Sequence, residues 1–191
     1  MKEKEQAGRL PWITWGAIER LTQIARNGEP ARWRVLEWGA GGSTAYWADL
    51  GVAEVLTIEH DPAWAARIRE VVSAKQVQLL LRPPAAEPNL VYASSFVAGS
   101  FEAYVMAARE MSEPDVVLVD GRARSACLVV AAEVAQRVVI LDNSDRVHYA
   151  LAMQRCETRL MQRGFRPGDT HTGTGPYSPD SRWSTTIWEK S

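Results

Sequence analysis

The sequence is poor in cysteine, has no long apolar run and carries almost no net charge. Its 191 residues include two cysteines, Cys127 and Cys156, which are too few for a disulfide framework or a zinc site. We interpret both as buried core residues. No apolar stretch approaches the roughly 20 residues that span a bilayer, and the charged start at 1–8 lacks the apolar segment of a signal peptide. These absences predict a soluble, cytoplasmic protein that does not act at a membrane.

The formal net charge of −1 comes from 22 basic and 23 acidic residues. No global field draws such a chain to polyanions, so a nucleic-acid partner is not expected. The length and a hydrophobic share of 46% suit a single domain, 1–191, with one core. Within it we expect a flexible tail at 1–10 and an N-terminal helix at 11–28. The sequence leaves open whether that helix covers the active site or a partner in a homodimer.

Apolar runs alternate with segments of helical periodicity along most of the chain. The expected strands are 33–38, 55–59, 77–81, 115–119 and 138–141. The expected helices after the first are 44–50, 62–73, 101–111, 124–135 and 145–163. Such alternation predicts a mostly parallel sheet with helices on both faces, a Rossmann-like three-layer α/β/α sandwich. Strand-like segments at Phe165 and 182–188 predict a closing hairpin with an antiparallel strand.

The segment 37–44 reads EWGAGGST, and it follows a strand and opens a helix. Glycines at Gly39 and Gly41 let the backbone turn sharply and approach a ligand closely. The dinucleotide pattern needs a third glycine where Thr44 stands, and the carboxylate of Glu37 would repel a pyrophosphate. That carboxylate suits a ligand with a positive amino group, such as S-adenosylmethionine (SAM). We therefore expect Glu37, Gly39, Gly41 and Ser43 to bind the cofactor.

The second strand ends in TIEHDP at 57–62. An acid at this position can accept hydrogen bonds from both ribose hydroxyls of a nucleoside. Glu59 ends the apolar run and is the cofactor-binding candidate. Asp61 is expected to cap the helix that Pro62 begins.

The run VLEWGAGGST at 35–44 resembles the first motif of class I SAM-dependent methyltransferases, and 57–62 is similar to their second. The resemblance implies a seven-stranded sheet whose last strand is antiparallel, with SAM as the cofactor. It also implies an adenine contact after the third strand, for which Ser94 is the candidate. Trp38 and Trp47 would wall the cofactor pocket, whereas Trp12 is assigned to the core.

Two further strands end in acids, at Asp120 and at Asp142-Asn143. Because parallel strands end at one rim, these side chains are expected to converge, and their oxygens suit Mg²⁺ or Mn²⁺. The trio resembles the ligands of cation-dependent O-methyltransferases of the catechol type. In that family a lysine acting as base follows the first Asp, but here the residues 121–124 read GRAR. The alternative, acceptor-site or structural carboxylates without metal, stays open.

The expected catalytic residues are Asp120, Asp142 and His148, since histidine titrates near neutrality and His148 is expected near the same rim. Arg122 and Arg124 suggest an acceptor with a carboxylate or phosphate. The predicted function is methyl transfer to an oxygen of a small-molecule or glycan acceptor. The alternatives are a non-catalytic, methyltransferase-like domain that binds SAM or acts as a scaffold, and a nicotinamide dehydrogenase, which Glu37 and Thr44 disfavour.

Overall fold

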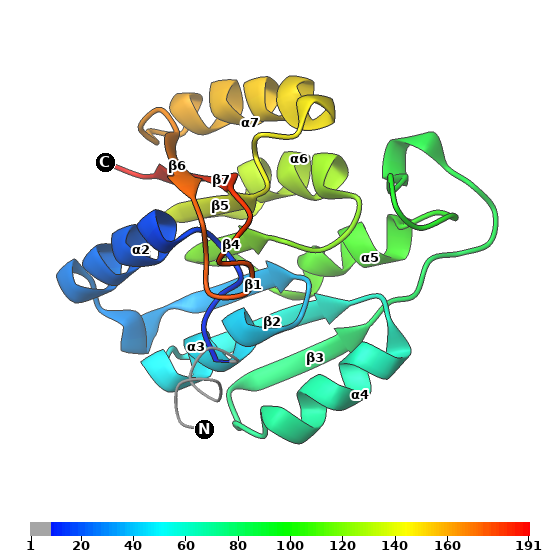
Figure 1. Cartoon of the computed structure of the whole chain (residues 1–191), viewed down its shortest axis with the longest axis horizontal. Helices are drawn as coiled ribbons and strands as arrows, with labels where there is room; N and C mark the ends of the chain where they lie inside the picture. Colours follow the sequence, from blue (N-terminus) through cyan, green and yellow to red (C-terminus); the bar gives the residue numbers. More distant parts are fainter. Residues whose placement is uncertain (1–8) are drawn as a thin grey trace.

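A computed structural model describes residues 9–191, so most of the expected tail at 1–10 lies outside the described residues (Figure 1). The chain forms a seven-stranded sheet of order β3-β2-β1-β4-β5-β7-β6. The strands are β1 (Arg34–Trp38), β2 (Glu54–Glu59), β3 (Val77–Leu81), β4 (Val116–Val119), β5 (Val138–Asp142), β6 (Asp169–Gly173) and β7 (Trp183–Glu189). The first five are parallel, and β7 runs antiparallel to both β5 and β6. The expected Rossmann-like sheet with an antiparallel C-terminal strand is confirmed.

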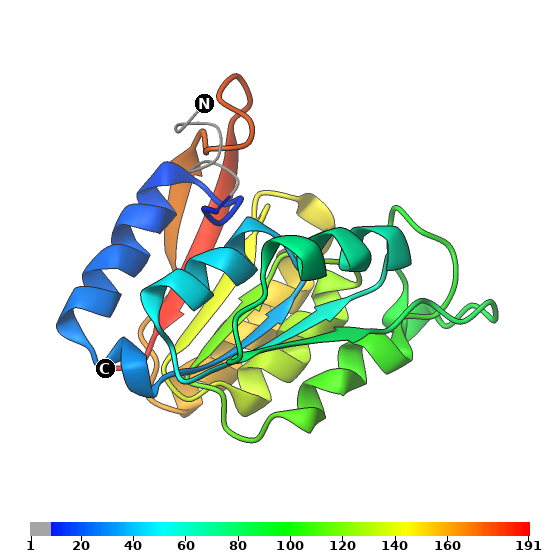
Figure 2. The ribbon, with the colours of Figure 1, turned by 90° about the horizontal axis from the view of Figure 1, so that it is seen from below.

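Helices cover both faces of this sheet, and Figure 2 shows the three layers from the side. The α-helices are α2 (Trp15–Asn27), α3 (Gly42–Leu50), α4 (Pro62–Val71), α5 (Glu102–Met106), α6 (Arg124–Val134) and α7 (Ala150–Gln162). Two apolar clusters follow from the alternation of side chains along each strand. In β1, Val35 packs with α2 and α3, whereas Leu36 and Trp38 belong to the cluster that includes α5, α6 and α7. None of the helices within 9–191 has the length and apolar character that crossing a bilayer requires.

Several element boundaries differ from the sequence prediction. The helix expected at 145–163 begins with the 3₁₀ turn Val147–Tyr149 and becomes α-helical only at Ala150. Phe165 makes a single bridge to Lys190, and the hairpin strand before β7 is β6. β6 reads DTHTG and lies at the edge of the sheet, so it has no apolar residue that would indicate a strand in the sequence.

The N-terminal segment is tied to the C-terminal hairpin. The N–H of Trp15 donates to the carbonyl of Thr174 at 2.9 Å, and the Thr14 hydroxyl donates to the carbonyl of His171 at 3.2 Å. Residues from opposite ends of the chain therefore meet beside the carboxyl ends of the central strands. Strand order reverses between β1 and β4, the place where open α/β sheets bind ligands.

Candidate functional site

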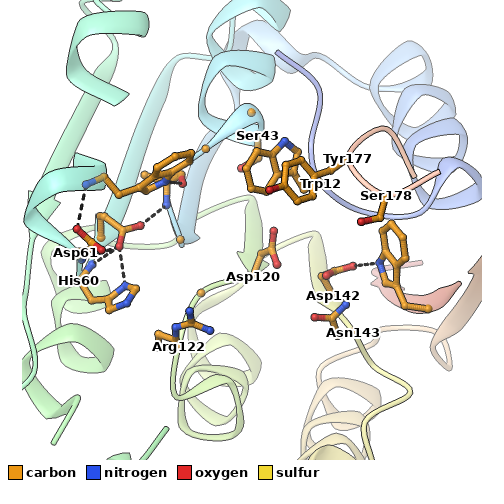
Figure 3. Close-up of a pocket in the computed structure, with 18 of the residues that line it drawn as sticks. Trp12, Ser43, His60, Asp61, Asp120, Arg122, Asp142, Asn143, Tyr177 and Ser178 are labelled. Carbon is orange, nitrogen blue, oxygen red and sulfur yellow. Dashed lines mark hydrogen bonds and ion pairs between the residues drawn. The ribbon is translucent and has the colours of Figure 1, made fainter. Parts of the chain in front are cut away.

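A cavity of about 620 Å³ lies at the carboxyl ends of the central strands (Figure 3). Its size falls within the range of small-molecule and cofactor sites. One half is lined by Gly39–Ser43 and Glu59–Asp61, after β1 and β2. The other half is lined by residues after β4 and β5 and by the hairpin loop: Asp120, Gly121, Arg122, Asp142, Asn143, Tyr177, Ser178, Ser181, Arg182 and Trp183. The predicted candidates Gly39, Gly41, Ser43, Glu59, Asp120, Asp142 and Asn143 are thus brought to one space.

The turn after β1 depends on Gly39. Its φ of +100° is a conformation that residues with a Cβ rarely adopt. A Cβ there would lie 2.9 Å from Gly121 Cα, and one on Gly121 would lie 1.9 Å from the Tyr104 hydroxyl oxygen. The turns after β1 and β4 therefore approach each other closely because neither residue has a side chain.

The side chain of Glu37 supports the glycine-rich loop through hydrogen bonds. It is fully buried, and its Oε1 accepts a hydrogen bond from the Thr44 hydroxyl, whose oxygen in turn accepts from the N–H of Gly41 at 3.0 Å. Burial raises the pKa of Glu37 to about 7, against hydrogen bonds that lower it. Glu37 does not line the cavity. The expected direct contact with a ligand ammonium is therefore not supported, because a position inside the sheet puts this carboxylate under the loop.

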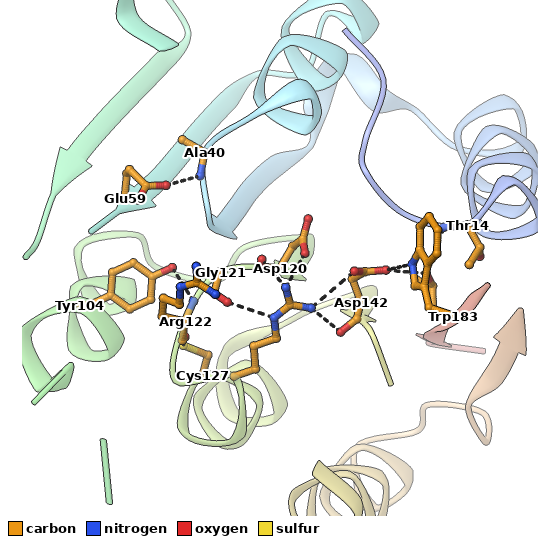
Figure 4. Close-up of polar contacts among 12 residues, drawn as sticks. Thr14, Ala40, Glu59, Tyr104, Asp120, Gly121, Arg122, Cys127, Asp142 and Trp183 are labelled. Atoms are coloured by element: carbon orange, nitrogen blue, oxygen red, sulfur yellow. Dashed lines mark hydrogen bonds and ion pairs between the residues drawn. The ribbon is translucent and has the colours of Figure 1, made fainter. Parts of the chain in front are cut away.

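Glu59 stands at the cavity wall, as expected. Its Oε2 accepts from the N–H of Ala40 at 3.1 Å, and its Oε1 accepts from those of His60 and Asp61 at 2.7 and 2.8 Å. These bonds fix the carboxylate and tie the ends of β1 and β2 together (Figure 4). Oε1 also lies 2.6 Å from His60 Nδ1, so the free acceptor capacity of this carboxylate is on Oε2, which has one partner. Asp61 caps α4 by accepting from two N–H groups, which confirms its predicted structural role and lowers its pKa.

Arg124 lies between the acids that end β4 and β5, and it is almost completely buried. Its guanidinium donates to the carbonyl oxygens of Asp120, Gly121 and Asp142 at 2.7, 3.0 and 2.5 Å. It also contacts the carboxylates of Asp120 at 2.8 Å and Asp142 at 3.5 Å. The prediction that Arg124 would face an acceptor is wrong, since its donors are used inside the protein.

The arginine bears directly on the expected metal site. Asp142 Oδ1 already accepts from Trp183 Nε1 and the Thr185 hydroxyl, both at 2.8 Å, and the guanidinium of Arg124 lies on its other oxygen (Figure 4). A divalent cation between the two acids would face a fixed positive charge. Residues 9–191 contain no group of three or more His, Cys, Asp or Glu that could hold a metal. The structure does not support a Mg²⁺ or Mn²⁺ site at Asp120, Asp142 and Asn143.

Asp120 points into the cavity toward the side chains of Trp12 and Tyr177 (Figure 3). Burial raises the pKa of this carboxyl well above its ordinary value, the positive charge of Arg124 opposes the shift, and the nearby Asp142 adds to it. Burial also raises the pKa of Asp142. Because the oxygens of Asp142 are engaged with Trp183, Thr185 and Arg124, Asp120 is the acid that remains available to a bound molecule.

Aromatic side chains cover the cavity. Trp12 stacks on Tyr177 with ring centroids 3.8 Å apart, and Trp64 lies 5.8 Å from Trp12 and donates to the carbonyl of Ala40 at 2.7 Å. Sequence reasoning missed the two tryptophans. Trp12 was assigned to the core, and no local signal marks a residue brought to the site by a distant hairpin. Trp38 and Trp47, expected to wall the pocket, are fully buried in the core instead.

Ser94 and His148 do not line this cavity, contrary to both expectations. The segment 82–100 extends outward from β3 (Figure 1), and Ser94 lines a separate small pocket together with His148. His148 is exposed and packs against the ring of Tyr149, with centroids 4.2 Å apart. Neither residue lines the cavity in this structure, because the chain leaves the rim before it reaches them.

No protein-family model matches the sequence, and no curated protein matches it either. Solved structures do resemble it. A methyltransferase-like protein from Silicibacter pomeroyi is 21% identical, with a TM-score of 0.57 over 89% of this chain and 84% of its own. An rRNA methylase from Streptococcus thermophilus is 11% identical, with a TM-score of 0.60 over 91% and 95%. A precorrin-6y C5,15-methyltransferase from Geobacter metallireducens is 15% identical, with a TM-score of 0.55 over 94% and 90%. The fold is that of the class I SAM-dependent methyltransferases.

Proposed function

We propose that the protein is a SAM-dependent methyltransferase that methylates an oxygen of a small acceptor without a divalent metal. One observation carries the proposal. A single cavity joins the glycine-rich loop and Glu59 on one side to Asp120 on the other. A cofactor and an acceptor can therefore meet inside it. The fold resembles those of methyltransferases that act on different acceptors, which supports SAM as the cofactor. The fold does not identify the acceptor, so we infer it from the residues of the site.

The residues of the first half fit the cofactor. Glu59 presents a fixed carboxylate whose Oε2 can accept a hydrogen bond from a ribose hydroxyl. A Cβ built on Gly41 meets nothing within 4 Å, so the loop leaves open space in front of it for a ligand. Ser43, at the start of α3, also lines the wall. We assign cofactor binding to Gly39–Ser43 and Glu59.

Bound SAM supplies an electrophilic methyl group at its sulfonium. The chain has to place an acceptor oxygen in line with that group and remove its proton. Asp120 lies at the wall of the acceptor half, and its raised pKa makes it a stronger base than an exposed carboxylate. Arg124 holds Asp120 through both its carbonyl and its carboxylate, so it acts as a positioning residue. The aromatic cover of Trp12, Trp64 and Tyr177 would limit the access of water.

Calorimetric titration with SAM and with S-adenosylhomocysteine tests the cofactor assignment. We expect micromolar binding of both that is unchanged by EDTA or Mg²⁺. Absence of binding under every condition would overturn the proposal. Binding without turnover on a panel of hydroxylated small molecules would instead favour the non-catalytic domain that senses SAM or acts as a scaffold.

Asp120→Asn tests the assigned base. We expect SAM affinity within about twofold of wild type and a loss of about 10²–10⁴ in the rate of transfer, the usual contribution of a general base. Asp49→Asn is the matched control, because Asp49 lies on the exposed side of α3, paired with Arg9 and away from the cavity. Equal rates for Asp120→Asn and wild type would remove Asp120 from the mechanism.

A further inference from the structure

A small pocket of about 40 Å³ lies beside the acceptor half of the main cavity. It is lined by Ser94, Ser95, Phe96, Ser125 and His148 among others, and Arg122 lines both this pocket and the main cavity. The volume has room for a few water molecules or one group of phosphate size, and it is too small for a whole cofactor or acceptor. Arg122 therefore lies between the main cavity and a second space that is about the size of one phosphate group.

Two guanidinium groups contact the ring of Phe96, which lines this pocket; Arg122 lines the pocket itself, and Arg146 approaches the ring from outside the pocket lining. Arg122 Cζ lies 5.3 Å and Arg146 Cζ lies 5.0 Å from the centroid of Phe96, which is 59% exposed. Each cation is attracted by the face of the ring, but the two positive charges repel each other. Within residues 9–191 neither arginine forms a salt bridge with an acid. The arrangement concentrates positive charge without an internal counterion.

A buried nitrogen atom of Arg122 also indicates that this place could hold an anion. Arg122 Nε is shielded from solvent and has no hydrogen-bond partner among the residues that the structure describes. A buried donor left without a partner is costly, and an oxyanion that accepted its hydrogen bond would remove that cost. The hydroxyls of Ser94, Ser95 and Ser125 around the pocket are further donors for such a group.

The charged side chains around the acceptor half of the main cavity also suit an anionic group. In the acceptor half, the carboxylates of Asp120 and Asp142 are offset in part by the buried Arg124, while Arg122 and Arg182 add two cations. The two acids and the two arginines that line this half balance each other, and the buried Arg124 behind them adds one positive charge. An anionic group of an acceptor would be attracted to Arg122 on this side of the cavity and oriented by it.

We propose that Arg122 and Arg146 form an oxyanion subsite that binds a phosphate or carboxylate group of the acceptor while its hydroxyl lies at Asp120. The inference rests on the proposed function and narrows its substrate to anionic small molecules. The subsite is confined, and the chain as a whole has a net charge of −1, which is unsuited to tracking the backbone of a polynucleotide.

Inorganic phosphate is the probe for the subsite, titrated at constant ionic strength and followed by ¹H–¹⁵N NMR shifts of the full chain. We expect saturable shifts at Arg122, Ser125 and Arg146. Arg122→Gln and Arg146→Gln should each weaken phosphate binding by about fivefold or more, the effect of losing one charged hydrogen bond. Arg159→Gln, at an exposed site on α7 with no ion pair among the described residues, removes the same charge and should change nothing.

The outcomes separate this proposal from the function on which it rests. SAM binding with no saturable phosphate shifts, or with equal phosphate affinity in all three variants, would overturn the subsite and leave the methyltransferase proposal standing. Phosphate binding that depends on Arg122 and Arg146, without any SAM binding, would support the subsite and overturn the enzyme. A single-stranded RNA of about 20 nucleotides that bound more tightly than phosphate, and lost affinity in the same two variants, would overturn the small-molecule assignment.

Discussion

Arg124 donates two hydrogen bonds to Asp120, one to its carbonyl oxygen at 2.7 Å and one to its carboxylate at 2.8 Å. The residues are four apart in the chain, and the same guanidinium reaches the carbonyl of Asp142 on the neighbouring strand. The ends of β4 and β5 are therefore joined by one side chain. That side chain also provides the positive charge beside the candidate base.

Replacing Arg124 should destabilise the fold. Arg124→Met keeps much of the volume but leaves the buried carboxylate of Asp142 and the partly buried one of Asp120 without their cation, and three carbonyl oxygens without their donor. We expect a loss of about 3–5 kcal/mol in the free energy of unfolding, the cost of breaking a buried ion pair. Urea denaturation measures it, with Arg155→Gln on the exposed face of α7 as the control. A loss below about 1 kcal/mol would show that Arg124 does not hold the strand ends.

The proposed methyl transfer should not need a divalent cation. The guanidinium of Arg124 contacts a carboxylate oxygen of both Asp120 and Asp142, the two acids that a metal would have to share. We therefore expect EDTA to leave methyl transfer unchanged. Mn²⁺ should cause no selective broadening of the NMR signals of residues 120 and 142. Loss of activity in EDTA, with recovery on adding Mg²⁺ or Mn²⁺, would contradict this interpretation.

Glu37 should make stability depend on pH. Burial raises its pKa from 4.5 to about 7 in the folded state, so between these values the folded chain holds a proton that the unfolded chain has released. Stability from this group is therefore greatest below about pH 4.5 and is lost as pH rises through about 7. The full difference corresponds to about 3 kcal/mol.

Glu37→Gln isolates this contribution because the amide cannot ionise. We expect the free energy of unfolding of the variant, relative to wild type, to increase by about 3 kcal/mol between pH 4.5 and pH 7.5. Glu19→Gln, at an exposed position of α2, is the control. A relative stability that stays constant across this range would show that the folded-state pKa of Glu37 is not raised.

Glu59 should contribute to cofactor affinity as well as to the fold. Glu59→Gln keeps one acceptor oxygen, but it replaces the other, which accepts backbone N–H groups, with an NH₂ group and loses the negative charge. We expect SAM to bind about 1–3 kcal/mol more weakly, the scale of a charged hydrogen bond. Calorimetry measures the affinity, and Glu70→Gln on the exposed side of α4 is the control. Unchanged affinity in Glu59→Gln would mean that the ribose lies elsewhere.

Gly39 and Gly51 provide a matched pair of glycines with positive φ. Gly51, at φ +73°, ends α3 with open space around a built Cβ, so Gly51→Ala should cost about 1 kcal/mol of backbone strain. Gly39→Ala adds a clash with Gly121, and we expect a loss of about 2–4 kcal/mol. Thermal unfolding of both variants measures the difference. Equal losses would show that the two turns can move apart.

The order of the parallel strands and the residue types at their carboxyl ends could be predicted from sequence patterns. Alternating apolar runs and helical periodicities predicted the five parallel strands, and the rule that parallel strands end at one edge brought Gly39, Glu59, Asp120 and Asp142 together. These predictions succeed because the spacing of apolar residues within each short segment shows which of its positions are buried. The segment after each strand is then constrained by the geometry of the turn.

The packing of distant segments set which way the side chains point and which parts of the chain meet. Glu37 lies under the loop, and Arg124 turns inward between two acids, so the structure does not support the expected metal site. Ser94 and His148 line a separate small pocket, whereas Trp12, from the N-terminal segment, lines the main cavity. Each outcome depends on packing and on the balance of buried charges between segments far apart in sequence. These contacts cannot be predicted from a local sequence pattern, because the free energy of a buried charge depends on neighbours that only folding brings close to it.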